Sequence, residues 1–164
     1  MNGFERARRW LALAVAGTAL SACVYLQPVQ EAQRLVGAPE SAVRARFGEP
    51  TDIFKLSDGR VRWIYSKQPL GRQAYAADFD TAGNLVSFRQ MLTTPELYKA
   101  QIGTWTKRDV AEHFGLPREP TSYFPLLRRL VWSYRFLHVD NWPSMFNFYF
   151  DDGGGVRQSR ETPS

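Results

Sequence analysis

The sequence carries one pattern twice, and this internal repeat constrains the fold more than any other feature. Residues 37–86 contain AVRARFGEP, WIY and DFDTAGNLV in that order, and residues 103–156 contain DVAEHFGLP, WSY and YFDDGGGV. The spacing grows from 67 residues (Val43 to Val110) to 71 (Gly83 to Gly154), as small loop insertions would produce. Nine identical residues in one order predict two copies of the same unit. In the first copy they are Val43, Phe47, Gly48, Pro50, Trp63, Tyr65, Phe79, Asp80 and Gly83.

Each copy is predicted to begin with one or two short helices. Val43 and Phe47 stand four residues apart and share one helical face, and Gly48 follows where a helix closes on a left-handed residue. The second copy repeats this spacing. There, Thr106 with Asp109 three residues later resembles a helix-start capping pair.

An antiparallel sheet is predicted after the helices of each copy. Asp58-Gly59 is typical of a hairpin turn, and residues 81–84 are expected to form a second turn. Apolar residues alternate along the flanking strands, so one face of each strand is predicted to be buried. These residues are Val61, Trp63 and Tyr65 in the first copy, and Leu130, Trp132, Tyr134, Phe136, Phe146, Phe148 and Phe150 in the second. The fold class is therefore α+β, with two tandem helix-plus-antiparallel-sheet units and Trp63 and Trp132 as equivalent core positions.

The N-terminus has the layout of a secretory signal peptide. MNGFERARR is basic, and the apolar run from Trp10 to Ala22 is 13 residues long. As a helix this run would span about 20 Å, which is short for a bilayer core of roughly 30 Å. Leu20-Ser21-Ala22-Cys23 resembles the lipobox of bacterial lipoproteins. That resemblance implies cleavage before Cys23, lipidation of its thiol with diacylglycerol, and acylation of the new N-terminus; plain secretion and an uncleaved anchor are the alternatives.

These features divide the chain into five parts. Residues 1–22 are predicted to be the signal peptide and residues 23–34 a lipidated tether. Residues 35–93 and 94–158 are the two α+β units, and residues 159–164 are a polar tail that we expect to fray. In the lipoprotein family an aspartate after the cysteine favours the inner membrane. Val24 stands there in this chain, so the family rule implies the periplasmic face of the outer membrane.

The ordered motifs of residues 35–158 resemble the SmpA/OmlA lipoproteins, a BamE-like group involved in outer-membrane assembly. Two such units in tandem resemble the architecture of the β-lactamase-inhibitory protein. The BamE-like assembly factor has one unit and this chain has two, so only Cys23 transfers from the lipoprotein pattern. The resemblance implies outer-membrane or barrel-assembly proteins as partners.

The residue inventory does not favour catalysis. His113 and His138 lie far apart and form no metal-spaced pair, so no metal or other cofactor is expected. Asp78, Asp80 and Asp151 are interpreted as turn-stabilising carboxylates, although paired carboxylates can also perform acid–base chemistry. The net charge falls from +5 to +3 without the signal peptide, which carries three arginines and one glutamate. This charge is too small to indicate nucleic-acid binding.

The second copy is unusually aromatic. Eight aromatic residues lie between Trp132 and Phe150, more than one pair of helices can cover. Tyr149 alternates out of step with its neighbours, and Trp142 lies in a loop, so both are candidate partner-binding residues. Inter-repeat packing is the competing explanation.

The sequence thus predicts a lipid-anchored, non-catalytic periplasmic protein-binding module in outer-membrane protein assembly or envelope integrity. The alternative is an inhibitor or regulator of a periplasmic hydrolase such as a β-lactamase.

Overall fold

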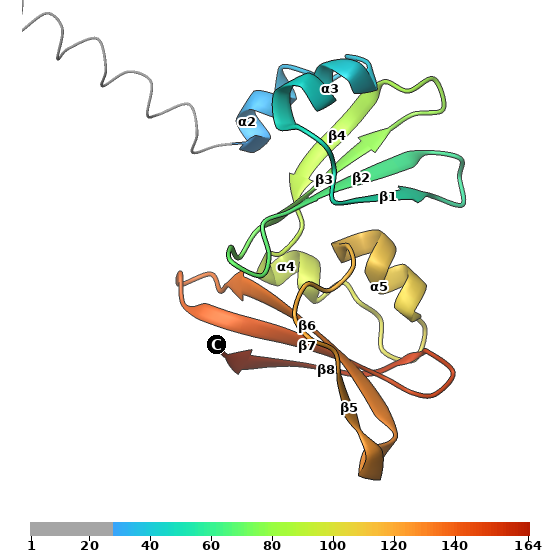
Figure 1. Ribbon diagram of the computed structural model, residues 1–164, viewed down its shortest axis with the longest axis vertical. Coiled ribbons are helices and arrows are strands. Elements are labelled where there is room, and N and C mark those ends of the chain that lie inside the picture. The colour runs from blue at the N-terminus through green and yellow to red at the C-terminus, as the bar shows by residue number, and fades with distance from the viewer. Residues whose placement is uncertain (1–27) are drawn as a thin grey trace, which may run out of the picture.

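The computed structural model describes residues 28–164 and has an α+β fold, as predicted (Figure 1). Two helices followed by four strands occur twice along the chain. The first set comprises α2 (Pro28–Gln33), α3 (Glu40–Phe47), β1 (Asp52–Lys55), β2 (Val61–Ser66), β3 (Ala74–Phe79) and β4 (Leu85–Gln90). The second comprises α4 (Thr94–Leu97), α5 (Lys107–Phe114), β5 (Ser122–Phe124), the 3-10 turn η2 (Pro125–Leu127), β6 (Arg129–Leu137), β7 (Pro143–Phe150) and β8 (Val156–Pro163).

The described residues form alternating layers of helices and antiparallel sheets. Each sheet is a meander in which neighbouring strands in sequence pair with each other. In Figure 1, α2 and α3 lie on one side of the first sheet, and α4 and α5 lie between the two sheets. Ala32 and Val43 therefore join one apolar core with the first sheet, while Val110 and Phe114 join a second core that contacts both sheets.

Strand alternation explains how the first sheet contributes to both cores. Trp63 and Tyr65 point toward α2 and α3, whereas Ile64 between them packs against the helices of the second unit. The predicted inward-facing residues of β6 and β7 also lie in or against the second core. The facing predicted from period-2 alternation is therefore confirmed.

A hydrogen bond common to both units links two of the repeated motifs. The Tyr65 hydroxyl donates to the carbonyl of Gly48 over 3.3 Å, and the Tyr134 hydroxyl donates to the carbonyl of Gly115 over 2.8 Å. Both tyrosines are buried, and this desolvation raises the pKa of Tyr65 to about 12 and that of Tyr134 further. The Trp-x-Tyr strand thus secures the glycine at which the preceding helix ends.

The strand–turn–strand motif supports the helix start in both units. The backbone N–H of Gly37 donates to the Leu85 carbonyl over 2.8 Å, and that of Gly103 donates to the Val156 carbonyl over the same distance. A register shift also interrupts the same place in both sheets, after Asp78 in β3 and after Tyr149 in β7. The two units therefore share backbone irregularities as well as motifs.

Two predicted segment boundaries are wrong. Residues 28–33 were expected to be tether, but they form α2, which buries Ala32 completely in the first core. Residues 159–164 were expected to fray, but β8 continues to Pro163 and pairs with β7 along its length. Polar composition is compatible with an edge strand, whose stability comes from backbone pairing on one side.

The two motif tryptophans are not equally buried, contrary to the prediction from the repeat. Trp63 is 1% exposed, whereas Trp132 is only partly buried. The Arg44 guanidinium of α3 lies 4.6 Å from the Trp63 ring centroid and covers it. The repeat spacing places Ala111 at the corresponding position of α5, and its methyl group is too short to do the same.

Candidate functional site

The predicted site residues do not form one cluster. Cys23 lies outside the described residues. Trp142 lies in the loop between β6 and β7 and is 66% exposed. Tyr149 is half-buried near the other end of β7, about 20 Å away at the rise of a strand, with its ring centroid 6.5 Å from that of Phe124.

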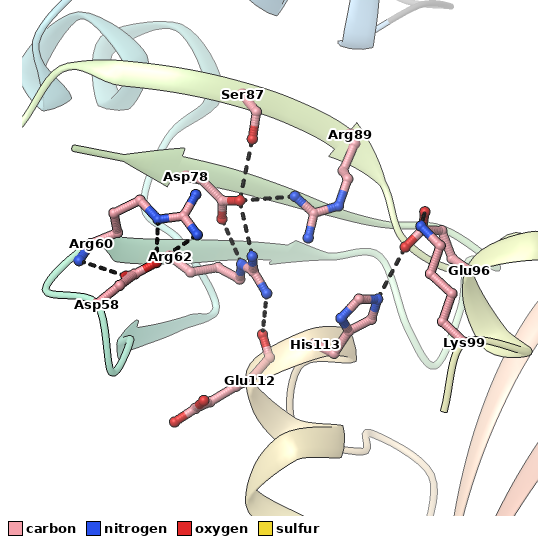
Figure 2. A network of polar contacts seen from close by, with 10 residues as sticks. All are labelled: Asp58, Arg60, Arg62, Asp78, Ser87, Arg89, Glu96, Lys99, Glu112 and His113. Atoms are coloured by element: carbon pink, nitrogen blue, oxygen red, sulfur yellow. Dashed lines mark hydrogen bonds and ion pairs between the residues drawn. The ribbon is translucent and has the colours of Figure 1, made fainter. Parts of the chain in front are cut away.

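The most buried charged group among the described residues is Asp78, at the interface between the two units (Figure 2). Its carboxylate accepts two hydrogen bonds from Arg62, at 2.5 and 2.9 Å, and one from Arg89 at 2.9 Å. The Ser87 hydroxyl donates a further bond of 3.2 Å. The expectation that Asp78 stabilises a turn is therefore wrong, because it is the acceptor of a buried ion-pair network inside β3.

This network also connects the first sheet to the second unit. Arg62 donates from Nη1 to the backbone carbonyl of Glu112 over 3.1 Å, near the end of α5. A cation at this position satisfies a free carbonyl and interacts favourably with the negative end of the helix dipole. Burial raises the pKa of Asp78, but its bonds to the two arginines outweigh this and lower the pKa overall.

A second polar pair joins α4 to α5. Glu96 accepts a hydrogen bond from Nε2 of His113 over 3.0 Å and forms an ion pair with Lys99. Burial lowers the pKa of His113, although the bond to Glu96 opposes this. The His113 ring packs against those of Trp105 and Phe114, with centroids 5.2 and 4.6 Å away. It is therefore a packed side chain of the helix layer, bonded to Glu96.

The two turn aspartates do what the sequence predicted. Asp80 accepts hydrogen bonds from the backbone N–H groups of Ala82 and Asn84, both at 2.9 Å. Asp151 accepts one from Gly155 at 2.9 Å and pairs with Arg157 at 2.5 Å. Each carboxylate is occupied by its own turn. Among residues 28–164, no group of three or more His, Cys, Asp and Glu residues could hold a metal ion.

Exposed apolar side chains gather on the two hairpins that flank β6. Seven of the 14 large apolar residues exposed among residues 28–164 lie within residues 123–142. At one end of β6 they are Tyr123, Phe124, Leu126 and Leu127, and at the other Leu137, Val139 and Trp142. Only Trp142 of this set was expected from the sequence, because the run SYFPLL resembles a buried strand. The repeat itself was the available clue: the equivalent turn of the first unit is the polar Asp58-Gly59.

The outer face of the second sheet is polar at its centre. Where the first sheet pairs Ile64 with Ala76 beneath α5, the second sheet pairs Ser133 with Asn147. The Ser133 hydroxyl donates to Asn147 over 2.7 Å, and the Asn147 amide donates to the Thr162 hydroxyl over 3.1 Å. Asn147 is only 7% exposed, and these hydrogen bonds satisfy its side chain on this face of the sheet.

No protein-family model matches this chain, and neither does any curated protein. Two solved structures are similar in part. An extracellular protein containing an SCP domain from Bacillus anthracis has 16% identity and a TM-score of 0.32. A cysteine-rich secretory protein from Staphylococcus aureus has 14% identity and a TM-score of 0.30. Each match covers 80% of this chain and 45% of the solved chain, and at these TM-scores neither informs the function.

Among residues 28–164, no helix combines the length and the apolar character needed to cross a bilayer.

Proposed function

We propose that this chain is a lipid-anchored, non-catalytic protein-binding module at the periplasmic face of the outer membrane. The observation that carries the binding role is the concentration of exposed apolar residues on the hairpins flanking β6. Exposed apolar groups gathered at one place are characteristic of interaction sites. Here they form two groups, one at each end of β6. Trp142 belongs to one group, and Tyr149 borders the other through its contact with Phe124.

The polar residues of the described chain are consistent with a non-catalytic role. Asp78 and His113 are engaged in contacts between elements, and Asp80 and Asp151 hold turns. An acid–base catalyst needs a titratable group within hydrogen-bond reach of a substrate, and these four are occupied by the protein itself.

The lipid anchor and the partner class rest on the sequence. The lipobox at Leu20–Cys23 supports attachment through Cys23, and Val24 supports the outer membrane. The motif order supports a tandem SmpA/OmlA-like architecture resembling that of the β-lactamase-inhibitory protein. Outer-membrane or barrel-assembly proteins are accordingly the proposed partners. Anchoring would confine the module to the membrane surface and raise its effective concentration for partners there.

Affinity purification of the full-length lipoprotein from envelope extracts tests this function against the hydrolase alternative. Stoichiometric co-purification of barrel-assembly proteins, lost in Trp142→Ala, supports the proposal. Stoichiometric inhibition of a β-lactamase or wall hydrolase, with no barrel-assembly protein recovered, would replace it with the inhibitor function.

A further inference from the structure

The hairpin formed by β5, η2 and β6 projects from the body of the protein at its lower end (Figure 1). Leu126 is fully exposed, Leu127 is 65% exposed, and Tyr123 and Phe124 are about half exposed. Residues 122–129 are called the apolar tip below. Leaving this much apolar surface in water is unfavourable by about 25 cal/mol per Å², so it calls for an explanation outside the free monomer.

Folding of the hairpin does not require an apolar tip. In the first unit the equivalent turn is closed by Asp58, which accepts from the backbone N–H of Arg60 at 3.1 Å and from its guanidinium at 2.7 Å. That polar turn joins β1 to β2 in the same antiparallel pairing that joins β5 to β6. The apolar tip is therefore a feature added to the second unit.

The apolar tip has a defined backbone. The Arg128 N–H donates to the Pro125 carbonyl over 3.2 Å, which closes the 3-10 turn, and Arg128 itself has a positive φ of 50°. Arg128 is also ion-paired with Asp152 in the neighbouring β7–β8 turn. Because the turn is already ordered, binding through it loses little conformational entropy.

The position of the apolar tip distinguishes a protein from the anchoring membrane as its target. Figure 1 has the longest axis vertical, with α2 toward the upper end and the apolar tip at the lower end. Cys23 is five residues from the start of α2, a reach of about 18 Å at most. The strand β6 begins at the apolar tip, and its nine residues alone span about 30 Å, which is longer than that reach. A lipid at Cys23 would thus hold α2 near the bilayer and leave the apolar tip pointing away from it.

We propose that the apolar tip is a docking element that inserts Leu126 and Leu127 into an apolar groove of a partner protein. Arg129 at its base, whose guanidinium bonds to the backbone carbonyl of Arg128, fits a groove with an acidic rim. This inference rests on the proposed function, because the lipid anchor decides between protein and bilayer as the target.

Site-specific photo-crosslinking in cells tests it on the full-length lipoprotein. A photoreactive residue replaces Leu126, or in the control Leu70, which is 97% exposed on the loop between β2 and β3 of the first unit. We expect a discrete protein adduct from position 126 and none of the same mass from position 70. Its partner, identified by mass and purified, should bind the chain at least tenfold more weakly with Leu127→Asp and unchanged with Leu70→Asp.

Three results would overturn the inference. They are a phospholipid adduct at position 126, equal adducts at both positions, and a partner whose affinity is insensitive to Leu127→Asp. Failure of the proposed function is detected by a separate measurement. An unlipidated chain in the soluble fraction would show that the protein has no lipid anchor, whatever the crosslinks show.

Discussion

At the residue scale, the two helix-ending glycines have one role in common and one that differs. Gly48 and Gly115 have φ of 82° and 83° with extended ψ, a region essentially restricted to glycine. A Cβ on Gly48 would meet nothing within 4 Å, whereas one on Gly115 would lie 2.9 Å from Cγ2 of Ile64. Gly115 therefore also permits the close approach of α5 to the first sheet.

This difference predicts unequal effects of the same substitution. Gly48→Ala should cost about 1–3 kcal/mol of unfolding free energy through backbone strain alone. Gly115→Ala should cost about 1–3 kcal/mol more, because the methyl group pushes into the packed side chain of Ile64. Chemical denaturation of both variants measures this, and equal losses would mean that the two units do not pack as described.

Asp78 allows a second residue-scale prediction. Asp78→Asn removes the charge that compensates the buried Arg62, so the free energy of unfolding should fall by about 3–5 kcal/mol. Asp80→Asn keeps an acceptor for the backbone of its turn and should have a much smaller effect. Denaturation curves test the contrast, which fails if the two variants are equally stable.

At the element scale, the sequence predicted what is local and periodic. Gly48 ends its helix with a positive φ, and Thr106 and Asp109 form a capping box, because both features depend on neighbours within a few residues. The polar β8 was missed because its pairing with β7 is not encoded in apolar alternation. The role of Asp78 was missed because its partners lie 16 and 11 residues away on other strands.

The layer of α4 and α5 should give the protein a pH-dependent stability. Burial lowers the pKa of His113 below 6.5, so the unfolded chain binds this proton more tightly than the folded one. The contribution of His113 to the free energy of unfolding is fully present above pH 6.5 and decreases as the pH falls below that value. In His113→Gln the melting temperature should change less between pH 7.5 and pH 5.5 than in the wild type. This range brackets the unperturbed histidine pKa. A wild-type protein that becomes more stable over this fall in pH would contradict the lowered pKa of His113.

The repeated strands give a prediction about packing. Trp63→Ala should cost about 3–5 kcal/mol, because the ring is almost fully buried against Phe79 and covered by Arg44. Trp132→Ala should cost roughly half as much, since its ring is only partly buried. Thermal unfolding of both variants tests this, and a larger loss at Trp132 would reverse the assigned facing.

At the scale of the whole molecule, the stacking of the units was not predictable from the repeat. The sequence indicated one or two short helices covering one face of each sheet, but the first sheet is covered on both faces and the second on one. This asymmetry depends on Arg62 reaching α5 and on Gly115 allowing the contact, which are long-range pairings. Of the candidate site, only Trp142 was predicted within the exposed region, because an apolar run does not reveal whether a tip is free or buried.

We propose that this stack of two units is held at a membrane by lipid on Cys23. The most direct test is the intact mass and membrane fractionation of the expressed full-length protein beside Cys23→Ala. We predict a wild-type mass that begins at Cys23 and includes the acyl chains, recovered in the outer-membrane fraction, and a Cys23→Ala protein that lacks both. An unlipidated wild-type protein in the soluble fraction would contradict the account.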